Sequence, residues 1–295
     1  MITGPYGTDS IRRMDSGERT QQVAGHGPGQ RPGLVHSVAD GVATVVISNP
    51  AKRNAMTAAM WEELPALLER LAADPAVRVL VLTGAGDTFC AGADITSLRD
   101  PATRTQALAV AAEEALAAFP KPSLAAVRGY CVGGGSQLAA ACDLRFAEEG
   151  ATFGITPAKL GVVYPASSTR RLVALVGPAA AKYLLFSGEL IDARRALRTG
   201  LVDEVLAAGG ALDERVRSFA RVLASRSLLT QAAAKEYVTG REDRDAYWAD
   251  QARRSGDTAE GVAAFLEHRT PRFTWTTGAA HPGPPPGVPD VPTSR

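Results

Sequence analysis

The chain has 295 residues, 45% of them hydrophobic and 21% charged, as in an ordinary globular protein with a large core. Lysine and arginine number 32 and aspartate and glutamate 31, so the net charge of +1 gives no reason to expect a nucleic-acid or membrane partner. The sequence has no apolar run of transmembrane length and no signal-peptide core, so we expect a cytoplasmic protein.

The positions of the cysteines and histidines exclude several classes of catalytic site. Cys90, Cys131 and Cys142 form no paired framework and no metal-binding spacing, so we expect reduced thiols. All four histidines stand near the ends, and none lies between Ser37 and Glu267. A Ser-His-Asp hydrolase or a zinc hydrolase built within the central part is therefore disfavoured, and no metal site is expected.

Glycine and proline mark the two ends of the folded part. Residues 1–33 are expected to form a disordered extension, and 274–295 a proline-rich disordered tail. The folded unit is then 34–273, which is long for one domain but acceptable for a layered α/β fold. Within it we expect a core at 34–205 and C-terminal helices at 206–273.

Strand and helix patterns alternate along the first part of this unit, and helical patterns dominate later. Alternating βα units followed by helices indicate an α/β fold, with a spiral or doubly wound sheet packed against a helical C-terminal region. The expected strands are 41–48, 77–83, 123–129 and 142–147; the expected helices are 57–73, 103–118 and 134–141, with mostly helical structure from 157 to 265.

Two runs of small residues follow predicted strands, at 89–95 and 129–137. Both lack bulky side chains where a ligand would approach the main chain. If the amides of Ala93 and Gly134 converge, they form an oxyanion hole, and the start of the helix at Gly134 adds a positive dipole. Each run alone is weak support, because glycine-rich turns are more often structural.

Together, and about forty residues apart, the two runs are specific. With the motifs around them, the sequence resembles the crotonase (enoyl-CoA hydratase/isomerase) superfamily over nearly the whole folded unit. The other matching segments are Asn49-Pro50, 53–56, 142–145, Phe153-Gly154, 200–205 and the stretch from Glu260 to Phe273.

The resemblance implies a crotonase-like spiral of ββα units, assembled as a homotrimer or hexamer. It implies an acyl-CoA thioester substrate, with coenzyme A as part of the substrate, no permanently bound cofactor, and a reaction of the lyase or isomerase class. The thioester oxygen would lie between the amides of Ala93 and Gly134. Coenzyme A contacts are implied at Lys52, Arg53, Ala91, Asp94 and Ile95.

The two glutamates that activate water in a typical hydratase of this superfamily have no counterpart. Their positions are occupied by Gln137, which cannot accept a proton as a base, and Pro157, which has no polar side chain. Conventional hydration is therefore doubtful. Glu113 and Glu114 could face the acyl pocket, but we expect them on the solvated surface.

Two alternatives stay open beside an atypical hydratase or isomerase, which we rank first. The stretch 156–164 resembles methylmalonyl-CoA decarboxylases, which share a tyrosine at Tyr164 but carry histidine at the position of Ala93. Tyr164 would then hold a carboxylate, although a packed aromatic with a hydrogen-bonded hydroxyl is the simpler expectation. The other alternative is a binding protein that keeps the fold and has lost the chemistry.

Overall fold

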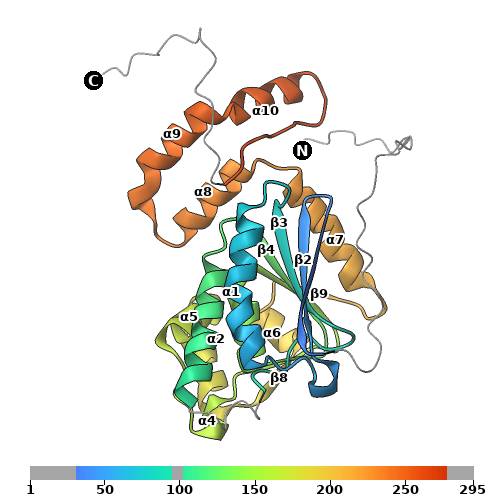
Figure 1. The fold of residues 1–295 in the computed structure, drawn as a ribbon, viewed down its shortest axis with the longest axis vertical. Coiled ribbons are helices and arrows are strands. Elements are labelled where there is room, and N and C mark those ends of the chain that lie inside the picture. Colours follow the sequence, from blue (N-terminus) through green and yellow to red (C-terminus); the bar gives the residue numbers. More distant parts are fainter. Residues whose placement is uncertain (1–30, 95–101, 278–295) are drawn as a thin grey trace.

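The computed structural model describes residues 31–94 and 102–277. Ile95 lies outside the described residues, as do most of the expected N-terminal extension and C-terminal tail. In the described part, the α/β class and the helical C-terminal region are confirmed (Figure 1).

A six-stranded sheet forms the centre of the molecule, in the order β1-β2-β3-β4-β6-β9. β1 pairs antiparallel with β2, and every other pairing is parallel. The central strands are almost continuously apolar because helices cover both of their faces. The bounds are β1 (Gly33–Ala39), β2 (Val42–Ser48), β3 (Val79–Gly84), β4 (Ser123–Val127), β6 (Leu144–Glu148) and β9 (Glu204–Leu206).

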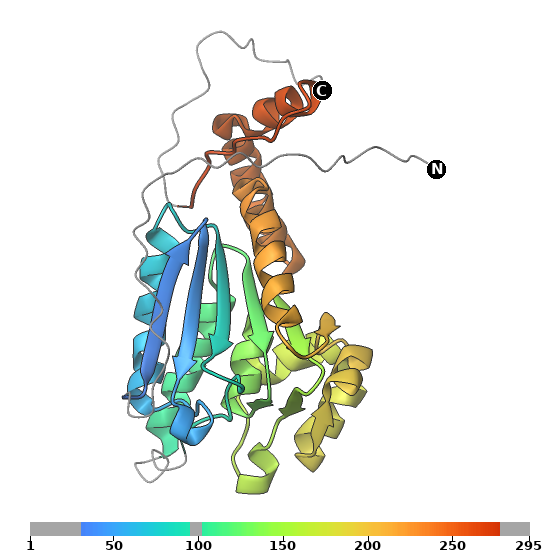
Figure 2. The same cartoon turned by 90° about the vertical axis from the view of Figure 1, so that its right-hand side faces the viewer.

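Helices α1 (Ala58–Ala73) and α2 (Ala102–Ala117) pack together on one face of this sheet (Figures 1 and 2). The Thr57 hydroxyl caps α1 by accepting a hydrogen bond from the amide of Met60, as the sequence predicts. The opposite face is covered by α7 (Ala211–Ala224), which buries a stripe at Leu212, Val216 and Ala220.

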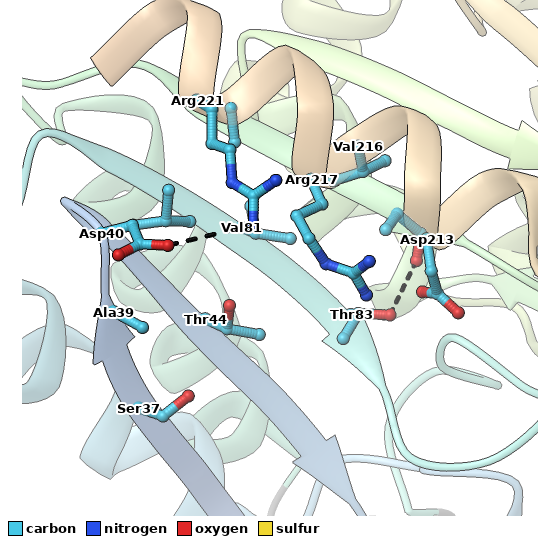
Figure 3. A pocket seen from close by; sticks show the side chains of 13 residues that line it. Ser37, Ala39, Asp40, Thr44, Val81, Thr83, Asp213, Val216, Arg217 and Arg221 are labelled. Carbon is cyan, nitrogen blue, oxygen red and sulfur yellow. Dashed lines mark hydrogen bonds and ion pairs between the residues drawn. The ribbon is translucent and has the colours of Figure 1, made fainter. Parts of the chain in front are cut away.

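Part of this second face stays open beside α7. A groove of about 370 Å³ runs between α7 and strands β1 to β3, over Thr44 and Val81 (Figure 3). Arg217 lines the groove, and Arg221 of α7 pairs with Asp40 at 3.9 Å. None of the residues that the sequence singles out for catalysis or coenzyme A binding lines it.

A smaller three-stranded sheet and four helices follow β4. The strands pair in the order β5-β7-β8. The long helix α5 is interrupted at Gly177, whose φ of 73° precedes Pro178. The bounds are β5 (Tyr130–Val132), α3 (Gly134–Ala141), β7 (Thr152–Gly154), α4 (Pro157–Leu160), α5 (Ala166–Ser187), β8 (Leu190–Asp192) and α6 (Ala193–Thr199).

The last three helices lie beyond one end of the large sheet (Figures 1 and 2): α8 (Leu228–Val238), α9 (Asp245–Ser255) and α10 (Asp257–Leu266). Trp275, which the sequence placed in the tail, is 2% exposed and packs against Trp248. Packing thus continues past residue 273. Among the described helices, none is long and apolar enough to cross a membrane.

Trp61 of α1 supports the start of α3, and its removal should destabilise the fold. Its ring is buried so close to Gly134 that a Cβ there would lie 2.9 Å from it. Trp61→Ala leaves a cavity, so the free energy of unfolding measured with urea should fall by roughly 3–5 kcal/mol. The exposed neighbour gives the control, since Glu62→Ala should change it by less than about 0.5 kcal/mol. If Trp61→Ala lowered the free energy of unfolding no more than Glu62→Ala, Trp61 would not be a support for the start of α3.

Candidate active site

The two loops singled out in the sequence lie against each other. Cys90 and Cys131 form a parallel bridge, in which the Cys90 amide donates to the Tyr130 carbonyl at 2.9 Å and the Val132 amide donates to the Cys90 carbonyl at 3.0 Å. This bridge joins the chain leaving β3 to the chain leaving β4. It brings the loop that ends at Asp94 to the beginning of α3.

The amides of Ala93 and Gly134 are neighbours as a result. A Cβ built on Gly134 would lie 3.5 Å from the Ala93 nitrogen, and one built on Gly92 would lie 3.5 Å from the Gly134 nitrogen. Neither amide donates to an acceptor within the described part of the chain. Gly134 opens α3, where first-turn amides have no acceptor inside the helix and the dipole is positive. Two such donors suit an oxygen that gains negative charge.

Glycine is required where α3 begins because the two loops approach so closely. A Cβ on Gly135 would lie 2.2 Å from the Cys90 carbonyl oxygen. Gly133, the residue before the helix, has a φ of 55°. A side chain at Gly135 would therefore push α3 and the Gly134 amide away from Ala93.

Four of the residues expected to contact coenzyme A lie together beside this pair of amides. Lys52 Nζ is 2.7 Å from Asp94 Oδ2, and the Ala91 amide donates to the Arg53 carbonyl at 3.0 Å. The Arg53 guanidinium lies 4.7 Å from the centre of the Tyr130 ring. The main-chain hydrogen bond between Ala91 and Arg53 and the ion pair between Lys52 and Asp94 join the 50–54 turn to the 89–94 loop.

Gln137 is buried one helical turn after Gly134. Its Nε2 donates to Glu113 Oε2 at 3.1 Å and to Ser168 Oγ at 3.0 Å. Pro157, the other position of a hydratase glutamate, is the first residue of α4 and supplies no polar side chain. The carboxylate nearest to Gln137 thus comes from α2.

The expectation that Glu113 lies on the solvated surface is wrong. Glu113 is 0% exposed, accepts a hydrogen bond of 2.5 Å from the Ser168 hydroxyl, and forms an ion pair with Arg171. Burial raises the pKa of the Glu113 carboxyl, and Ser168 and Arg171 oppose that rise. Glu114 does face solvent, with its side chain 47% exposed, and also contacts Arg171.

The helical spacing of α2 could have indicated that Glu113 is buried. Glu113 lies four residues after Ala109 and three before Leu116, within the stripe that α2 packs on its neighbours. Ser168 had no comparable signal, because its role depends on where α5 meets α2 and α3. A charged residue on the apolar stripe of a helix can be buried when an oppositely charged residue from another element, such as Arg171, pairs with it.

Tyr164 packs against the core cluster, as expected for a packed aromatic. Its hydroxyl makes no hydrogen bond to the described residues, contrary to the simpler expectation. Burial, and after it the Glu113 carboxylate, raise the pKa of Tyr164 well above its ordinary value. The loop before Tyr164 is tied to α2 by Gln106, whose Nε2 donates to the Val163 carbonyl at 2.7 Å.

Comparisons with known proteins agree with this architecture. The family model described as enoyl-CoA hydratase/isomerase matches residues 37–276. The crotonyl-CoA hydratase of Syntrophomonas wolfei is 36% identical over 246 residues, which cover 79% of this chain and 94% of that protein. The 2,3-dehydroadipyl-CoA hydratase of Escherichia coli is 33% identical over 249 residues, covering 81% and 98%.

A solved structure agrees as well. The enoyl-CoA hydratase from Bacillus anthracis superposes with a TM-score of 0.77 at 29% identity, covering 82% of this chain and 98% of that one. The expected crotonase fold is therefore confirmed. The chain belongs to the enoyl-CoA hydratase/isomerase family of acyl-CoA enzymes.

Proposed function

We propose that this enzyme binds an acyl-CoA thioester and stabilises the enolate form of its acyl group between the main-chain amides of Ala93 and Gly134. The observation that carries the proposal is that these two amides are neighbours and donate to no acceptor in the described part of the chain. Hydrogen bonds from two such donors to an oxyanion stabilise the transition state by several kcal/mol. The positive end of α3 adds to this effect.

Coenzyme A is proposed to lie along the turn at Lys52 and Arg53 and the loop at Ala91 and Asp94. Both side chains of the turn are cationic, which suits the phosphates of coenzyme A. Lys52 is held by Asp94 at 2.7 Å, so its ammonium group has a fixed position beside the loop. Ile95, the next residue in the sequence, is a further proposed contact and lies outside the described residues.

Hydration or isomerisation is the reaction class that we rank first. The two curated relatives compared above are both hydratases. This site would run such a reaction with Gln137 and Pro157 in the two glutamate positions. Because neither side chain removes a proton, we propose that conventional hydration is slow.

Decarboxylation of a malonyl-type thioester is the second candidate, and it has the merit of needing no base. Tyr164 would hold the leaving carboxylate with its hydroxyl, which makes no hydrogen bond to the described residues. That carboxylate would then lie near the buried Glu113. The negative charge of Glu113 raises the pKa of Tyr164, so it would also repel a substrate carboxylate held there. Arg171 opposes this repulsion only in part, because Glu114 as well as Glu113 engages it. The charge distribution therefore favours a neutral acyl group.

Self-assembly is also part of the proposal. The C-terminal helices carry large apolar side chains in solvent, including Val238, Phe265 and Leu266, the last two 79% and 70% exposed. Large exposed apolar side chains on helices suit burial against other copies. We propose a cytoplasmic homotrimer or hexamer without a nucleic-acid or membrane partner.

Gly134→Pro tests the proposed anion site. Proline is tolerated at the first position of a helix but has no amide hydrogen, so turnover should fall by roughly a hundredfold or more. Gly134→Ala is the control, because its Cβ meets Trp61 as the proline Cβ does but it keeps the amide, and it should lose less. Equal turnover in a folded proline variant and the alanine variant would refute the assignment.

A panel of crotonyl-CoA, malonyl-CoA and methylmalonyl-CoA, followed by mass spectrometry, tests the reaction class. Crotonyl-CoA should be hydrated more slowly than about 10 per second, the usual scale for enzymes. Tyr164→Phe should leave that hydration unchanged and abolish any decarboxylation. Efficient malonyl-CoA decarboxylation that needs Tyr164 would reverse our ranking, and no reaction with any thioester would favour a binding protein.

The assembly is tested by sedimentation, which should give a mass that is a multiple of three chains. Chelators should leave turnover unchanged, because the proposed chemistry uses main-chain donors and no metal. A stable monomer that keeps full activity would contradict the proposed assembly. Inhibition by a chelator that added metal reverses would contradict the proposed chemistry.

A further inference from the structure

The Gln137 side chain is clamped by two helices other than its own. Its Nε2 donates to Glu113 of α2 and to Ser168 of α5, at 3.1 and 3.0 Å. The Ser168 hydroxyl in turn donates to the same Glu113 oxygen at 2.5 Å. These three groups close a triangle of hydrogen bonds in which each donor has an acceptor.

Glu113 decides which way the carboxamide faces. An ionised carboxylate accepts hydrogen bonds and donates none, so only the nitrogen side of the Gln137 amide can face it. Arg171 supplies the positive charge that favours the ionised form of this buried group. The reverse orientation would bring the amide oxygen against the carboxylate and leave two buried acceptors facing each other.

The Gln137 oxygen therefore points away from the clamp. This Oε1 makes no hydrogen bond to the described residues, and it is not among the four buried side-chain atoms in the described part that lack a partner. It is thus reachable by solvent, although Gln137 as a whole is 8% exposed. Gln137 lies three residues after Gly134, on the same side of α3.

We infer that Glu113 is a positioning residue: together with Ser168 it holds Gln137 so that a neutral hydrogen-bond acceptor faces the acyl site. Gln137 Oε1 then orients a water molecule or a hydroxyl of the acyl group beside the thioester, and it repels a carboxylate. This role rests on the proposed thioester function. Glu113 itself, having no exposed surface, acts through Gln137 rather than by touching the substrate.

The clamp can be observed directly in the full-length protein by the side-chain amide signals of Gln137 in ¹⁵N NMR, assigned by their loss in Gln137→Glu. Glu113→Gln keeps the size of the side chain but no longer fixes the orientation of its partner. We expect the Gln137 signals to shift and their exchange with water to speed up by at least about tenfold in this variant. Ser168→Ala, which removes the second partner, should shift the same signals.

Steady-state kinetics with the thioester that the natural protein converts best gives the second measurement. Misplacing Gln137 should lower kcat by about ten- to a hundredfold in Glu113→Gln, with KM changed by less than about threefold. The matched control is Glu114→Gln, which removes the adjacent exposed carboxylate that does not contact Gln137. It should change neither the signals nor kcat by more than about twofold.

The exchanged pair Glu113→Gln with Gln137→Glu separates positioning from a purely structural ion pair. It restores a hydrogen bond between α2 and α3 but turns a carboxylate toward the acyl site. We expect kcat to recover above that of Glu113→Gln, and its fall at acidic pH to come at a different pH from that of the natural protein, because the carboxylate that must stay ionised is now at position 137 and no longer the buried Glu113. No recovery, or the same pH profile in both proteins, would overturn the inference.

Failure of the inference differs from failure of the proposed function. If the natural protein converts no thioester, the function is wrong, and the NMR measurement still decides whether Glu113 orients Gln137. If the natural protein is active but the Gln137 signals stay unchanged in both Glu113→Gln and Ser168→Ala, the function stands and the positioning role is overturned.

Discussion

The backbone bridge between Cys90 and Cys131 is the constraint on which the candidate site depends. β3 and β4 are parallel neighbours, so both chains leave the sheet at the same edge, and the bridge continues their pairing beyond it. The absence of a Cβ at Gly135 then lets α3 begin directly over the Cys90 carbonyl. The amides of Ala93 and Gly134, which donate to no acceptor in the described part of the chain, lie next to each other there.

A site whose anion donors are main-chain groups tolerates change in the surrounding side chains. Replacing a side chain leaves the Ala93 and Gly134 amides in place as long as the glycines and the bridge remain. The side chains next to the proposed donors come from α2, α3 and α5 and are held by hydrogen bonds of their own. In the proposed function, stabilisation of the negative charge depends on the main chain, whereas the reaction that follows depends on these side chains.

The parts that could be predicted from the sequence are those with a local cause. Thr57 and the apolar spacing after it predict α1, and the glycine run predicts where α3 begins. The short strands β5, β7 and β8 could not be predicted, because three residues carry too little pattern and each strand exists through pairing with distant chain. Glu113 was misjudged for the same reason: its burial requires Ser168 and Arg171, which arrive from α5 more than fifty residues later.

The position of Glu113 also changes how the glutamine in α3 is interpreted. Taken alone, Gln137 in place of a glutamate indicates a lost base. Beside Glu113 it is one half of a carboxylate–carboxamide pair, in which the negative charge lies on α2 and is paired there with Arg171. A second carboxylate at Gln137 would lie within hydrogen-bond distance of Glu113, and two like charges so close cannot both stay ionised. The amide at Gln137 is therefore what a buried acid at Glu113 requires, and the two residues are best understood as a single unit.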